Sequence, residues 1–83
     1  MEDQHVGELA PQMQVWDDLG YKIGSVARRH TGVVEVKTGP FGLGTHFYVP
    51  ESAIREVTED GVFLTQSKDV VAREYRRKPE FNQ

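Results

Sequence analysis

The sequence predicts a mainly β protein, a small closed antiparallel barrel of about six short strands with one C-terminal helix. Eight glycines and four prolines in 83 residues indicate many turns. Between these turn residues the apolar side chains fall in short runs, several of which alternate with polar residues as half-buried strands do. Six short strands in so small a chain leave long exposed edges if the sheet stays flat, and closing the sheet removes those edges. A barrel with one helix across an open end or a seam is therefore the predicted architecture.

The chain is expected to divide into four segments. Residues 1–11 are polar and acidic and end in a proline, so they are predicted to form a flexible acidic arm. Residues 12–66 form the predicted β domain, residues 67–78 the helix, and residues 79–83 a tail. No apolar stretch approaches the length of a membrane span, and there is no cysteine. We therefore expect a cytoplasmic protein that makes no contact with a membrane.

The apolar runs define the expected strands, which cover residues 13–16, 21–29, 33–37, 46–49, 54–58 and 62–65. Val34 and Val36 share one face of their strand. Ile23 and Val26 are both expected to point inward, although they are an odd number of residues apart. Gly24, which lies between them, is the natural place for a β-bulge that corrects this spacing.

The helix is predicted from its two ends. Ser67 can accept a hydrogen bond from the free N–H groups of a first turn, and Asp69 suits the positive end of the helix dipole. The pairs Asp69–Arg73 and Glu74–Lys78 have the i,i+4 spacing of favourable ion pairs. Because Pro79 prevents continuation, the helix is predicted to end at residue 78.

Two stretches resemble PRC-barrel domains. The first is Asp18-Leu19-Gly20-Tyr21-Lys22-Ile23-Gly24-Ser25-Val26, and the second is Tyr48-Val49-Pro50 followed by Ile54, Val57 and Val62-Phe63-Leu64. The resemblance spans about residues 13–66 and is closest to a small stand-alone bacterial family of unknown function. It implies a small barrel of antiparallel strands. Relatives in a photosynthetic reaction-centre subunit and in a ribosome maturation factor use the domain for assembly and binding, but the fold alone does not carry their functions to this chain.

No residue pattern predicts catalysis or metal binding. His5, His30 and His46 lack the spacing of metal ligands and are interpreted as surface histidines. No serine lies in a nucleophile elbow, and the adjacent Asp17 and Asp18 are most simply turn formers. We therefore expect no enzyme activity, no cofactor and no metal.

The loop 38–45 is the predicted partner-binding region. It contains three glycines together with Phe41 and Leu43, and it leads into Tyr48. It lacks the Gly-Lys-Ser/Thr ending of a phosphate loop. Two alternatives are open: these apolar side chains fold back over the barrel mouth, or they form an exposed patch that meets a protein partner or a second copy in a homodimer.

Basic residues suggest a second, alternative site. The candidates for nucleic-acid contact are Arg28, Arg29, Arg73, Tyr75, Arg76, Arg77 and Lys78, with the tyrosine stacking on a base. The simpler interpretation is a solvated helix end that complements its dipole, and the net charge of −3 also argues against a nucleic-acid partner. The expected function is therefore a non-catalytic interaction or assembly module. The alternative is an RNA-contacting or ribosome-associated accessory protein.

Overall fold

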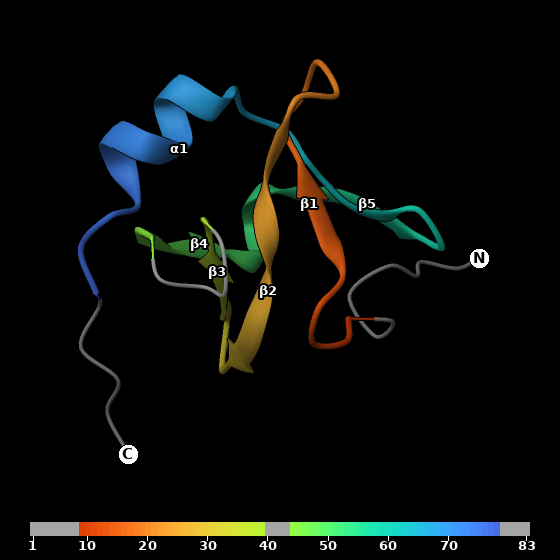
Figure 1. Ribbon diagram of the computed structural model, residues 1–83, viewed down its shortest axis with the longest axis horizontal. Helices are drawn as coiled ribbons and strands as arrows, with labels where there is room; N and C mark the ends of the chain where they lie inside the picture. Colours follow the sequence, from red (N-terminus) through yellow and green to blue (C-terminus); the bar gives the residue numbers. More distant parts are fainter. Residues whose placement is uncertain (1–8, 40–43, 79–83) are drawn as a thin grey trace.

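The computed structural model describes residues 9–39 and 44–78, and their fold is a single curved β-sheet with one α-helix (Figure 1). The strands are β1 (Gln14–Trp16), β2 (Lys22–His30), β3 (Val33–Lys37), β4 (His46–Pro50), β5 (Ile54–Thr58) and β6 (Gly61–Leu64), and the helices are the short 3₁₀ helix η3 (Glu51–Ala53) and α1 (Lys68–Glu74). The prediction of a mainly β chain with one C-terminal helix is confirmed.

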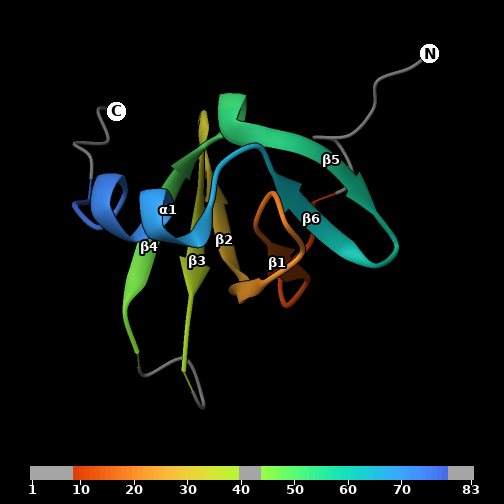
Figure 2. The same cartoon turned by 90° about the horizontal axis from the view of Figure 1, so that it is seen from above.

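The strands follow one another across the sheet in the order β4-β3-β2-β1-β6-β5. Figure 2 shows that β5 and β6 run at a steep angle to β3 and β4, so the sheet bends around the core. Within the described residues no strand ladder joins β4 to β5, and the sheet is open there. The pairing of β1 with β6 is parallel, so the expectation of a wholly antiparallel sheet is wrong at this place. The hairpin with β5 fixes the direction of β6, and β6 then covers the free edge of β1.

The core lies on the inner face of the curved sheet. Alternate residues of the strands are buried, as the prediction for Val34 and Val36 required. The buried apolar side chains are Val15, Ile23, Val26, Val34, Val36, Phe47, Val49, Ala53, Ile54, Val62, Leu64 and Val71. Because Val71 belongs to α1, the helix covers part of the core and is held by it.

Strand β2 contains the irregularity that its sequence predicted. Ile23 and Val26 are both buried despite their odd spacing. The register with β1 shifts here, so that Ile23 is an additional residue on β2 immediately before Gly24. A side chain at position 24 would overlap the carbonyl oxygen of Lys37, so glycine is required by a close approach of β3.

The helix is shorter than predicted. Ser67 is its N-cap, and its Oγ accepts a hydrogen bond from the Val70 amide at 3.2 Å, as expected. However, α1 ends at Glu74 instead of Lys78. The physical reason is tertiary: the Tyr75 carbonyl accepts a 2.7 Å hydrogen bond from the Tyr48 amide of β4, which draws the chain out of the helical path.

Residues 9–12 lie against the sheet. Leu9 packs on the core, and the Gln12 amide donates a 2.8 Å hydrogen bond to the Val26 carbonyl. The remainder of the predicted arm and the predicted tail lie outside the described residues. Among the described residues, the helices are too short to cross a membrane.

Candidate binding face

The outward face of strands β2, β3 and β4 collects polar side chains from three neighbouring strands. Because Val34 and Val36 point into the core, Glu35 and Lys37 point away from it on β3. The same alternation turns the even-numbered residues of β4 outward. In the strand register Glu35 lies opposite Arg28 on one side and opposite Tyr48 on the other. We call this surface the outer face and define it by Arg28, His30, Glu35, Lys37, His46 and Tyr48.

Two histidines share one carboxylate at the centre of the outer face. The Nε2 atom of His30 lies 2.9 Å from Glu35 Oε1, and the Nδ1 atom of His46 lies 2.7 Å from Glu35 Oε2. Since an ionised carboxylate only accepts, each imidazole donates an N–H. The side chain of Glu35 is 14% exposed, against 22% for His30 and 36% for His46. The three groups therefore form a half-buried cluster that spans the three strands.

The cluster determines the protonation of its carboxylate. Burial by itself raises the pKa of Glu35, but the hydrogen bonds from His30 and His46 and the attraction of their positive charge outweigh burial. The pKa of Glu35 is therefore held below its ordinary value. A carboxylate that stays ionised with both oxygens occupied is poorly suited to accept a further proton as a general base.

The outer face carries more positive than negative charge. Arg28 is exposed and Lys37 is half-buried, and neither forms an ion pair with any residue that the structure describes. Glu35 is the acidic member of the face, and its oxygens are already bonded to imidazoles. The face is therefore basic within a chain whose net charge is −3.

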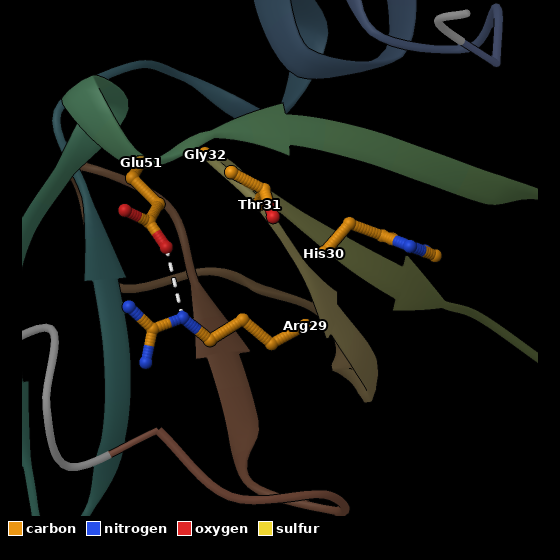
Figure 3. A pocket seen from close by; sticks show the side chains of 5 residues that line it. All are labelled: Arg29, His30, Thr31, Gly32 and Glu51. Atoms are coloured by element: carbon orange, nitrogen blue, oxygen red, sulfur yellow. Dashed lines mark hydrogen bonds and ion pairs between the residues drawn. The ribbon is translucent and has the colours of Figure 1, made fainter. Parts of the chain in front are cut away.

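A shallow hollow of about 420 Å³ borders the outer face at the turn between β2 and β3 (Figure 3). It is lined by Arg29, His30, Thr31, Gly32 and Glu51. Arg29 Nε lies 2.9 Å from Glu51 Oε2, and the Glu51 amide donates a 3.0 Å hydrogen bond to the Gly32 carbonyl. In Figure 3 the His30 side chain points away from this ion pair, so the hollow and the cluster are neighbouring but distinct features.

The arrangement offers chemistry suited to recognition. In residues 9–39 and 44–78 no group of three metal-ligating side chains is placed to hold a metal ion. In the hollow, Thr31 is exposed, and Arg29 already forms an ion pair with Glu51. The outer face presents charges and an aromatic ring and borders a shallow hollow, which are features of a binding surface.

The predicted partner-binding residues are placed only in part. Tyr48 lies on the outer face, half-buried and opposite Glu35. Phe41 and Leu43 lie outside the described residues. The sequence missed the cluster beside Tyr48, because His30, Glu35 and His46 are brought together by the pairing of three strands. The outward position of each residue was available from the alternation, but the strand register was not.

The residues of the alternative nucleic-acid site fall into two places. Arg28 and Arg29 belong to the end of β2, at the bottom of Figure 1, whereas Arg73, Arg76, Arg77 and Lys78 belong to α1 and the chain after it, at the left. Tyr75 is half-buried, and its hydroxyl donates a 2.6 Å hydrogen bond to Gln66 Oε1. The ring therefore packs on the core and is poorly placed to stack on a base.

Two further surface features lie away from the outer face. In the turn between β1 and β2, Leu19 is 75% exposed and Tyr21 is 64% exposed. On β1 and β6, the Trp16 ring stacks on Phe63 at a centroid distance of 6.3 Å, and the Arg55 guanidinium lies 5.7 Å from the Phe63 ring centre. In this aromatic group the indole N–H of Trp16 already has a partner within the protein, because it donates a hydrogen bond to the Asp60 carbonyl.

Two comparisons with known proteins find no match. No model of a protein family matches the chain, and no curated protein matches it. The function must therefore be argued from the surface itself.

Proposed function

We propose that this protein is a non-catalytic binding module that docks a protein partner on its outer face. The observation that carries the proposal is the cluster of His30, Glu35 and His46 beside Tyr48. Its hydrogen bonds hold three polar side chains in one arrangement before any partner arrives. Preorganised side chains lose less conformational entropy on association, which makes a surface better suited to binding.

Tyr48 supports a protein partner in particular. Tyrosine is enriched in protein interfaces because its ring is apolar and rigid while its hydroxyl forms hydrogen bonds. The strand that carries Tyr48 also continues from the loop 38–45, so we retain Phe41 and Leu43 as proposed members of the same contact surface. The partner is another protein or a second copy of this chain.

The proposal includes a class of fold. We infer that the curved sheet belongs to the small barrels and that the PRC-barrel resemblance reflects this. Support comes from the short η3 that connects β4 to β5, and from the Thr65 amide, which donates a 2.8 Å hydrogen bond to the Ala53 carbonyl. Both features bring the two ends of the sheet toward each other. A cytoplasmic location and the absence of enzyme activity belong to the same proposal.

The experiment compares two variants in partner capture. Intact protein with Tyr48→Ala should lose a partner that the wild type retains, because the aromatic ring beside the cluster is removed from the outer face. The matched control is Tyr21→Ala, which removes an equally large ring from the exposed turn between β1 and β2. Thermal unfolding verifies that both variants are folded. If Tyr48→Ala retains every partner while Tyr21→Ala loses them, the docking surface is the turn.

A specific observation also favours a second candidate, an RNA-contacting accessory protein. Arg76, Arg77 and Lys78 are consecutive and exposed, and none forms an ion pair with another described residue. Such a group attracts phosphates, and the affinity then falls steeply with salt. Salt-dependent RNA binding that disappears when all three are changed to Gln would favour this function over the first.

A further inference from the structure

The outer face has a charge pattern that points to the chemistry of its partner. Arg28 and Lys37 are its permanent cations, and they flank the cluster on two different strands. The negative charge of Glu35 is directed at two imidazole N–H groups and is therefore partly withheld from an incoming ligand. A partner thus meets N–H donors and positive charge across the face.

Resting on the function proposed above, we infer that the outer face binds an acidic segment of a partner protein, and that binding tightens when His30 and His46 take up protons. With neutral imidazoles, two cations on the face stand against one carboxylate. Protonation adds two more positive charges while Glu35 remains ionised. The change makes the face strongly basic, without any change in the backbone.

The charged groups around the two histidines support this increase in positive charge. From β2 the neighbouring charged group is Arg28, from β3 it is Lys37, and from β4 the facing group is Tyr48. The ion pair between Arg29 and Glu51 borders His30 across the hollow. Among these groups, Glu35 and Glu51 carry the negative charges, and each of these carboxylates already bonds a basic side chain. Added protons therefore increase the charge that a ligand encounters.

An acidic protein segment fits this surface better than a nucleic acid does. The whole chain has a net charge of −3, which repels a long polyanion beyond the contact region. A short acidic segment meets mainly the local basic face, because salt screens more distant charges within about 8 Å at physiological ionic strength. The half-buried ring of Tyr48 also offers apolar contact that a phosphate backbone does not use.

The test uses a fluorescently labelled oligo-aspartate peptide with an oligo-asparagine peptide as the uncharged control. Fluorescence anisotropy measures affinity for the intact protein at about pH 5.5 and about pH 7.5, which bracket the range in which histidine ordinarily changes charge. We expect roughly fivefold tighter binding of oligo-aspartate at the lower pH, the scale of two partly exposed ion pairs. Equal affinity at the two pH values would overturn the inference.

Three variants assign the effect to the outer face. The double change His30→Gln with His46→Gln retains side-chain donors for Glu35 and should abolish the pH dependence. Arg28→Gln should weaken binding at both pH values, whereas Arg55→Gln, which removes the same charge on β5, should not. Circular dichroism establishes that each variant is folded. An equal loss in Arg55→Gln would mean that the peptide senses overall charge, and the inference would be wrong.

Two outcomes separate this inference from the proposed function. In the first outcome, a protein partner is lost with Tyr48→Ala, but its affinity depends neither on pH nor on Arg28. The proposed docking function is then supported, and the inference of an acidic partner with proton-dependent binding is wrong. If a single-stranded oligoribonucleotide binds more tightly than oligo-aspartate and depends on Arg28, the face is a nucleic-acid site and both proposals fail.

Discussion

The side-chain carboxylate of Asp17 accepts a hydrogen bond of 2.9 Å from the backbone amide of Lys68, 51 residues further along the chain. Its other oxygen accepts from the amides of Leu19 and Tyr21 at 2.9 and 2.8 Å. The residue is only 2% exposed. One carboxylate therefore shapes the turn between β1 and β2 and attaches the first residue of α1 to that turn. The expectation that Asp17 forms a turn is confirmed, and the link to the helix is an addition.

Asp17→Asn should destabilise the protein by about 2 kcal/mol, because an amide has one accepting oxygen and would leave a buried backbone N–H without its partner. Urea unfolding of the two proteins measures the difference. Asp18→Asn is the matched control, since Asp18 is exposed and should change the free energy of unfolding little. Equal effects of the two changes would show that the hydrogen bonds of Asp17 contribute nothing special.

The same residue predicts a dependence of stability on pH. Burial raises the pKa of Asp17, but the backbone hydrogen bonds from Tyr21, Lys68, Leu19 and Gly20 outweigh burial, so its pKa is lowered in the folded state. Its contribution to stability is therefore complete above the unfolded-state value of about 3.9 and is lost as the pH falls through the lower folded-state pKa. Urea unfolding at a series of pH values should show the difference between wild type and Asp17→Asn shrinking below about pH 4. A difference that stays constant into strong acid would contradict the lowered pKa.

Gly24→Ala should cost more than about 1 kcal/mol, because even one methyl group at this position overlaps the Lys37 carbonyl oxygen. The measurement is again the free energy of unfolding in urea. Ser25→Ala on the same strand serves as the control, since it inserts nothing into this contact. A neutral result at position 24 would mean that β3 moves away freely and that the close approach is not required.

Leu9 predicts where the dispensable part of the N-terminal arm ends. Leu9→Ala should lower stability by about 1 kcal/mol, because the side chain packs partly buried against the core. Deletion of residues 1–8 is expected to leave the melting temperature within about 3 °C. Calorimetry measures the melting temperatures of the Leu9→Ala variant and of the protein that lacks residues 1–8. If the deletion lowers the melting temperature strongly while Leu9→Ala leaves it unchanged, residues before Leu9 contribute to folding and the dispensable part of the arm is shorter.

The strands were largely predictable because their signals are local. The strands 33–37 and 54–58 have their predicted bounds, and the other four differ by one residue at an end or at both ends. Ser67 as the N-cap was also predictable, since capping depends on a side chain near its own helix. The C-terminal end of the helix was not predictable, because the Tyr75 carbonyl accepts its hydrogen bond from the Tyr48 amide, which belongs to β4.

In the candidate site, too, the features with a local sequence signal were predictable and those that depend on tertiary contacts were not. Tyr48 was selected because it follows a glycine-rich stretch of sequence with two large apolar residues, which is a local pattern. The cluster around Glu35 depends on which residues of three strands lie side by side, and a shift of one residue in register would turn Glu35 inward. The sequence alone did not reveal this register, because the pairing of β2 with β3 shifts at a bulge between Val26 and Arg28.

A strand at the end of a sheet is a template on which a foreign strand can assemble, since its outward N–H and C=O groups are free. In β4 the Tyr48 amide, at the middle of the strand, is already bonded to the Tyr75 carbonyl. An invading strand would first have to displace the chain that follows α1, and this displacement would pull on a helix anchored in the core by Val71. Aggregation through this edge is therefore opposed by the packing of the core itself.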